Sequence, residues 1–197
     1  MKRLAATRKT TSRFVPSAAG AGTHASPEPD LDRAEKILLE MLAIPGKSCH
    51  EGQVAEYISK QLRRAGVPAR AIESDSAHRR SPYGGERGNL IVRLPGTIPG
   101  RPRMFSAHLD TVPLCAGARP VIRKGFVVPA EKTTALGADD RSGATVILSA
   151  ALEIVRRNLP HPPLVFLWTV QEELGLWGAR NVSVGMLGKP CMAFNFD

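Results

Sequence analysis

Three short stretches of this 197-residue sequence carry pairs of side chains that can bind metals or move protons. The first is His108-Leu109-Asp110, which follows an apolar run. Side chains two positions apart on an extended strand point to the same side. His108 can therefore bind a metal while Asp110 holds its tautomer, as carboxylates behind metal-bound histidines do. Taken alone, the motif is also compatible with a polar pair at the end of a strand.

Two further pairs are acidic. Asp139 and Asp140 directly precede a long apolar stretch, and Glu172 and Glu173 directly follow another one. Capping of a helix accounts for one aspartate, and a surface turn accounts for the glutamates. Adjacent carboxylates nevertheless repel each other unless a cation relieves the repulsion. Asp197 follows a third apolar run, so four expected strand ends or helix starts carry residue types that ligate metals.

The apolar stretches between these residues predict the elements that position them. Leu164–Val170 and Cys191–Phe196 are expected as strands buried on both faces, and Arg103–Ala107 as a further strand. Arg141–Leu159 is apolar on nearly every side, which indicates a helix packed deep against the sheet. Strands that alternate with helices predict an α/β fold. In open α/β sheets, ligands bind beyond the carboxyl ends of the strands, which is where the polar residues fall.

The donor types at this edge indicate the class of metal. One imidazole with several carboxylates, and no thiolate, suits a hard or borderline divalent ion such as zinc, cobalt or manganese. So many carboxylates favour two metal ions over one, and they leave a glutamate that can act as a base. The residues alone therefore predict a metal-dependent site.

The remaining elements are expected from apolar spacing and from turn signals. Asp30 is the predicted N-cap of a helix that ends before Pro45-Gly46, and a second helix is expected from about Glu51 to Ala65. The glycine-rich run Gly84–Gly88 predicts a turn and not a phosphate-binding loop, because no helix follows it. Further short strands are expected at Ala69–Glu73, Leu90–Leu94 and Gly125–Val128.

Composition narrows the class of protein. The chain is 43% hydrophobic and 23% charged, an ordinary globular balance in a chain long enough to build its own core. The net charge is +9, but residues 1–27 carry five basic side chains and no acid, so the total charge is weak support for nucleic-acid binding. Three widely spaced cysteines argue against a disulfide framework and for a reducing compartment. We also expect no membrane span, because no apolar run is long enough.

Three segments, in this order, resemble the successive signatures of the zinc peptidases of clan MH, family M20. They are Ser106-Ala107-His108-Leu109-Asp110-Thr111-Val112, Gly137-Ala138-Asp139-Asp140-Arg141-Ser142-Gly143 and Gln171-Glu172-Glu173-Leu174-Gly175. The Gly-Ala-Asp-Asp block is most similar to the peptidase T-like (tripeptide aminopeptidase) branch. The resemblance implies an α/β fold, namely a three-layer zinc-exopeptidase-like catalytic domain with a mixed, largely parallel sheet.

The resemblance also implies a role for individual residues. Two zinc ions would be held by four ligands: His108 and Asp197 on the first ion, Glu173 on the second, and Asp139 on both. The peptide bond between Asp139 and Asp140 would be cis. Asp110 would orient His108, and Glu172 would be the general base that deprotonates the attacking water. Cobalt or manganese could replace zinc.

Two features depart from the family pattern. Arg141 stands where the family usually has lysine, which keeps the charge. The chain also has roughly half of the family's length, so it would lack the rest of the catalytic domain, its last histidine ligand and the lid domain that mediates dimerisation. The resemblance therefore implies residues 30–197 as the N-terminal part of a catalytic domain, incomplete at the C-terminus, that is expected to be inactive alone. Residues 1–29 are expected to form a disordered basic leader and linker.

The predicted function is metal-dependent hydrolysis of amide bonds in small peptides. Three alternatives remain: a truncated, non-catalytic homologue that binds metal or a partner, a deacylase acting on N-acyl amino acids, and a basic nucleic-acid binder. The last is disfavoured because Phe14 is the one aromatic residue of the leader available for stacking. We expect a cytoplasmic protein with a small peptide substrate, without nucleic-acid or membrane partners, whose full-length form is a possible homodimer.

Overall fold

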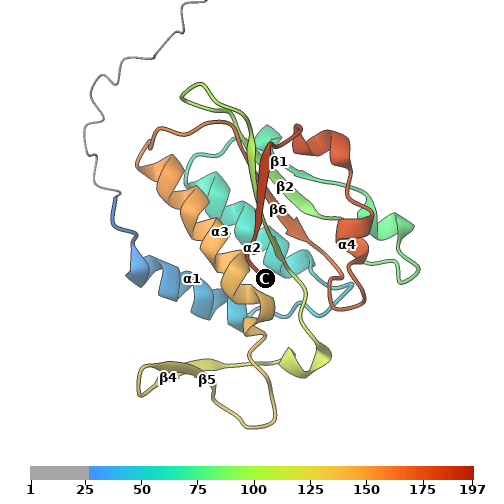
Figure 1. The fold of residues 1–197 in the computed structure, drawn as a ribbon. Helices are drawn as coiled ribbons and strands as arrows, with labels where there is room; N and C mark the ends of the chain where they lie inside the picture. The colour runs from blue at the N-terminus through green and yellow to red at the C-terminus, as the bar shows by residue number, and fades with distance from the viewer. Residues whose placement is uncertain (1–26) are drawn as a thin grey trace, which may run out of the picture.

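A computed structural model describes residues 27–197. Five strands form its central sheet in the order β1-β2-β6-β3-β7 (Figure 1). Their bounds are Ile72–Ser74 (β1), Leu90–Leu94 (β2), Arg103–His108 (β3), Leu164–Thr169 (β6) and Met192–Asn195 (β7). Strand β3 runs parallel to β6 and β7, whereas β2 is antiparallel to β1 and β6. The sheet is therefore mixed, and its parallel strands end at one common edge.

Helices cover both faces of this sheet, which confirms the α/β class (Figure 1). The helices α1 (Leu31–Ala43), α2 (Gly52–Arg64) and α3 (Ala138–Arg156) enclose the main core on one face. On the other face, a smaller cluster includes Leu167 of β6 and Leu187 of the 3-10 helix Val184–Leu187, near the short helix α4 (Trp177–Arg180). None of the helices in residues 27–197 is long and apolar enough to cross a membrane.

Helix α3 is anchored tightly to the centre of the sheet. Leu148 and Leu152 are fully buried on it, and the indole nitrogen of Trp168 on β6 donates to the carbonyl oxygen of Ala144 at 3.3 Å. Burial of apolar surface on this scale is the main force that fixes one element against another. The start of α3 is thereby held at the edge where β3 and β6 end.

Local sequence signals account for the boundaries of the first helix. The Asp30 carboxylate accepts a hydrogen bond from the Arg33 backbone N–H at 3.0 Å, so Asp30 is the N-cap that the sequence predicts. The helix ends at Ala43, two residues before Pro45. The expected leader lies mostly in residues 1–26, outside the described part of the chain.

Some expected elements differ from the structure. Strand β7 is exposed along its whole length because it lies at the edge of the sheet, so the expectation of burial on both faces is wrong there. It is correct for β6, which is buried throughout between β2 and β3. The expected strand Ala69–Glu73 is a 3-10 helix at Ala69–Ala71 followed by β1.

The expected strand near Gly125 is one half of a separate hairpin. Strands β4 (Pro120–Arg123) and β5 (Phe126–Pro129) pair antiparallel and stand apart from the main sheet (Figure 1). The two residues between them, Lys124 and Gly125, both have positive φ. That conformation matches the two-residue hairpin turns that favour glycine.

Candidate metal centre

The predicted site residues come from four places that meet at one edge of the sheet. His108 is the last residue of β3. The register pairs it with Thr169 of β6, so Glu172 and Glu173 follow directly from the neighbouring strand. Ser106 pairs with Asn195 on the other side, and the Phe196 N–H donates to the Ser106 carbonyl oxygen at 2.9 Å. This register carries Asp197 alongside His108.

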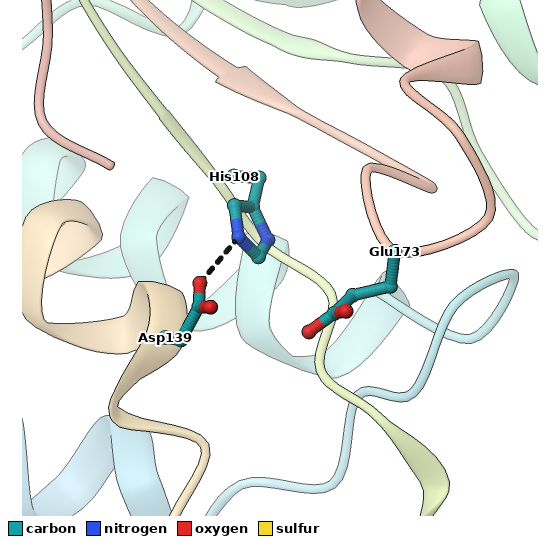
Figure 2. Close-up of side chains that lie close together, drawn as sticks. All are labelled: His108, Asp139 and Glu173. Atoms are coloured by element: carbon teal, nitrogen blue, oxygen red, sulfur yellow. Dashed lines mark hydrogen bonds and ion pairs between the residues drawn. The ribbon is translucent and has the colours of Figure 1, made fainter.

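His108 is the centre of the cluster. Its side chain is buried, and its Nε2 atom lies 2.9 Å from an Asp139 carboxylate oxygen, 3.8 Å from Glu172 and 3.9 Å from Asp197. Figure 2 shows the carboxylates of Asp139, from α3, and Glu173, from the loop after β6, directed towards the imidazole ring. One ligand atom from each of His108, Asp139 and Glu173 lies within 4.8 Å of the others.

Asp140 belongs to a second group of the same size. One ligand atom from each of His108, Asp140 and Asp197 also lies within 4.8 Å of the others. The Asp140 carboxylate accepts the backbone N–H groups of His108 and Gly143, each at 2.9 Å. Sequence reasoning did not include Asp140 among the ligands, although its place beside Asp139 in an acidic pair was the signal that could have identified it.

The backbone at the start of α3 separates the two aspartates. Asp139 and Asp140 have non-helical φ and ψ within the span of α3, and the peptide bond between them is cis, as the resemblance implies. Gly137, immediately before, has a φ of 71°, and a Cβ added there would lie 2.7 Å from a Thr111 methyl carbon. Glycine is therefore required at Gly137 both by its conformation and by its packing.

Asp110 supports two parts of the cluster. Its backbone oxygen lies 3.0 Å from Nδ1 of His108, closer than its carboxylate oxygen at 3.5 Å. The carboxylate accepts the backbone N–H groups of Glu172 at 2.9 Å and Glu173 at 3.2 Å, and the Ser48 hydroxyl at 2.6 Å. Asp110 thus holds both the imidazole and the loop that carries the two glutamates. The sequence predicts that Asp110 orients His108 through its carboxylate, but the backbone oxygen is the closer atom. The contacts of Asp110 with the glutamate loop were not predicted.

The electrostatics of the cluster favour a positive charge at His108. Burial alone would lower the pKa of His108, but hydrogen bonds and charge from Asp110 and Asp139 outweigh it and raise the pKa to about 9. Burial, with the neighbouring Asp197 charge, raises the pKa of Asp140 to about 6. Burial and neighbouring carboxylates also raise the pKa values of Glu172 and Glu173. Carboxylates crowded in this way are stabilised by a cation.

Arg141 and the other histidines lie outside this cluster. Arg141 is buried, and its guanidinium donates to the Gly46 carbonyl oxygen at 3.5 Å. Burial lowers its pKa to about 10, so it stays charged at neutral pH. Among residues 27–197, His50, His78 and His161 belong to neither group of candidate ligands. The acidic edge therefore has His108 as its one imidazole within the described residues.

The chain is similar in sequence and in fold to known peptidases. The cytosol non-specific dipeptidase of Escherichia coli (strain K12) is 33% identical over 167 residues, which cover 78% of this chain and 30% of that protein. A Bacillus subtilis (strain 168) protein, YqjE, is 32% identical over 149 residues, which cover 76% of this chain and 38% of YqjE. The chain thus spans well under half the length of these curated relatives.

A solved structure agrees with the fold. The aminopeptidase PepT from Bacillus cereus ATCC 10987 superposes with a TM-score of 0.77 at 28% identity, covering 86% of this chain and 44% of that chain. The motifs resemble family M20. The family model that matches the chain, however, is that of Peptidase family M28, over residues 89–197. The matched part exceeds half of the sequence and contains every candidate ligand, and the chain belongs to Peptidase family M28.

Proposed function

We propose that this protein contributes a metal centre to a hydrolase that cleaves amide bonds in small peptides, with aminopeptidase or tripeptidase activity. The observation that carries the proposal is the convergence of two acidic groups on one buried imidazole, His108, with the Glu172 carboxylate 3.8 Å away. The likeness to the E. coli dipeptidase and to B. cereus PepT supports a peptide substrate. Because the motifs resemble those of family M20 and the fold matches B. cereus PepT, we infer a peptidase T-like activity for this chain.

The donor set fits zinc. Nitrogen and carboxylate oxygen are donors that zinc accepts, and cobalt or manganese suits the same atoms. His108, Asp139, Glu173 and Asp197 would hold such ions, and Asp140 lies in the group that contains His108 and Asp197. When bound, such ions polarise the scissile carbonyl and increase the acidity of water.

Glu172 is placed to act as the general base. Its carboxylate faces the cluster, and its backbone N–H is fixed by Asp110, so the side chain starts from a defined position. Burial and nearby carboxylates raise its pKa, which strengthens it as a proton acceptor. Glu172 would take a proton from the attacking water as oxygen adds to the carbonyl carbon. It would then give the proton to the amine as the carbon–nitrogen bond breaks.

We propose a cytoplasmic protein with a small peptide substrate and without a nucleic-acid or membrane partner. The cytosolic name of the E. coli relative and the three free cysteines support that location. We further propose that residues 30–197 are the N-terminal part of a longer catalytic domain, and that the full-length form is a homodimer.

A chimaera tests the proposed reaction. Residues 30–197 would replace the matching segment of B. cereus PepT, whose remaining chain supplies the length that this chain does not span. Thermal melting and zinc content would verify folding and loading before assay. We expect the chimaera to hydrolyse unblocked tripeptides and the Glu172→Gln chimaera to lose that activity. Cleavage of N-acyl amino acids in place of peptides would identify a deacylase, and a folded, loaded but inert chimaera would support the non-catalytic reading.

A further inference from the structure

Three successive backbone amides in the loop after β6 each donate to a buried carboxylate. The N–H groups of Glu172 and Glu173 donate to Asp110, which the proposed mechanism already uses. The preceding N–H, from Gln171, donates instead to Glu51 at 3.1 Å. Glu51 is outside the candidate ligands and outside the proposed acid–base chemistry, so its contact with this loop requires a separate explanation.

Glu51 is completely buried. One of its carboxylate oxygens, Oε1, accepts both the Gln171 N–H and the Cys49 N–H, the latter at 2.9 Å. Both donors have left-handed backbone conformations, with φ of 55° at Gln171 and 73° at Cys49. A single oxygen atom of Glu51 therefore joins its own loop to a loop 120 positions later in the sequence. The two residues that donate to it have backbone conformations that need external support.

Capping of α2 does not account for this carboxylate. Glu51 occupies the N-cap position of α2, where a side chain normally accepts an N–H from the first turn, yet it makes no such bond. The Gly52 N–H is satisfied by the Glu86 carboxylate instead, at 3.0 Å. The second oxygen of Glu51, Oε2, is buried without a hydrogen-bond partner among the described residues. The side chain is thus directed away from its own helix and towards the loop after β6.

We propose that Glu51 is a positioning residue that fixes the Gln171–Glu173 loop against the metal centre. The inference rests on the proposed function, because it gives Glu172 and Glu173 the roles of base and ligand. A buried N–H that loses its hydrogen-bond acceptor costs stability. Without Glu51, the Gln171 N–H would lose the one side-chain acceptor that it has among residues 27–197, and the loop that carries the two glutamates would lose this anchor.

Variants at Glu51 distinguish a loss of loop positioning from a general loss of protein stability. Glu51→Gln keeps an oxygen acceptor of the same reach, Glu51→Asp withdraws the acceptor by one methylene group, and Glu51→Ala removes it. Leu62→Ala is the matched control, since Leu62 is fully buried at the opposite end of the same helix α2. Its substitution leaves a cavity that destabilises the protein without touching the loop after β6.

Hydrogen exchange on the metal-free, full 197-residue chain is the first measurement. We expect the amides of residues 171–173 to exchange about tenfold faster or more in Glu51→Ala and Glu51→Asp than in the wild type. Glu51→Gln should restore most of the protection, and Leu62→Ala should change these amides no more than it changes the sheet as a whole. Unchanged exchange at residues 171–173 in Glu51→Ala and Glu51→Asp would overturn the proposal.

Cobalt binding, followed by absorbance, is the second measurement. Loss of a group that supports metal ligands lowers metal affinity by about tenfold to a hundredfold. We expect that loss in Glu51→Ala and Glu51→Asp but not in Glu51→Gln or Leu62→Ala. An equal loss in Leu62→Ala would reduce Glu51 to a general structural role and overturn the proposal. Absence of cobalt binding in the wild type would count against the proposed function, while the exchange result would still decide the role of Glu51.

Discussion

Glu172 and Glu173 are neighbours in sequence with different surroundings. The Glu173 carboxylate reaches the group formed with His108 and Asp139, whereas the Glu172 carboxylate lies 3.8 Å from His108 and outside both groups of candidate ligands. The same side chain, Asp110, fixes the backbone N–H of each. From this shared anchor, the carboxylates of the proposed ligand Glu173 and of the proposed base Glu172 reach different positions in the cluster.

Glu172→Gln separates these roles. The amide keeps the size and hydrogen-bonding capacity of the side chain but cannot accept a proton, so we expect turnover by the chimaera to fall by about 10²–10⁴-fold. Zinc content, measured by atomic absorption, should stay at the wild-type level. Near-normal turnover would show that Glu172 is structural. Loss of zinc together with turnover would instead make Glu172 a ligand.

At the scale of elements, α3 holds the two aspartates at the sheet edge through its buried face. Leu148 is fully buried on α3, whereas Val146, two positions before it, is 48% exposed. Leu148→Ala removes a well-packed core side chain, and we expect it to lower the free energy of unfolding by about 2–5 kcal/mol. Val146→Ala, the control, should cost far less because little of that side chain is packed.

Urea denaturation of both variants measures this difference. A loss in Val146→Ala as large as that in Leu148→Ala would mean that both faces of α3 are packed in solution, contrary to the exposure described here.

The elements around the site were predictable where one strong pattern dominated. The continuous apolar run of β6 and the apolar helix α3 were foreseen, because buried strands and helices need such sequences. The grouping of Asp140 with Asp197 and the contact of Glu51 with Gln171 were not foreseen. They depend on strand register and on backbone conformations that local sequence does not specify. The exposure of β7 follows from its place in the sheet order and not from its own residues.

At the scale of the whole molecule, the outer edge of the sheet is apolar. Met192 and Phe194 of β7, and Phe196 after it, are each more than one-third exposed. Phe194 stacks on Phe105 of β3, with ring centroids 5.5 Å apart, which keeps β7 against the sheet. In the described residues, β7 has β3 as its one strand neighbour. An exposed apolar edge strand promotes association through strand pairing.

We therefore expect the 197-residue chain to self-associate as its concentration rises. Phe194→Lys places a charge on this edge and should lower the mass measured by static light scattering. Phe126→Lys is the control, since it adds the same charge on the hairpin β4–β5, where Phe126 is 71% exposed. A monodisperse wild-type chain, or an equal effect of both variants, would contradict association through β7.

We propose that the edge formed by β3, β6, β7 and the start of α3 holds a divalent metal. Equilibrium dialysis of the 197-residue chain against zinc, followed by measurement of bound zinc per chain, tests it most directly. Because His108 belongs to both groups of candidate ligands, we predict that the wild type and Glu172→Gln bind zinc and that His108→Ala loses it. Equal zinc binding by folded wild type and His108→Ala, or none by the wild type, would contradict the claim.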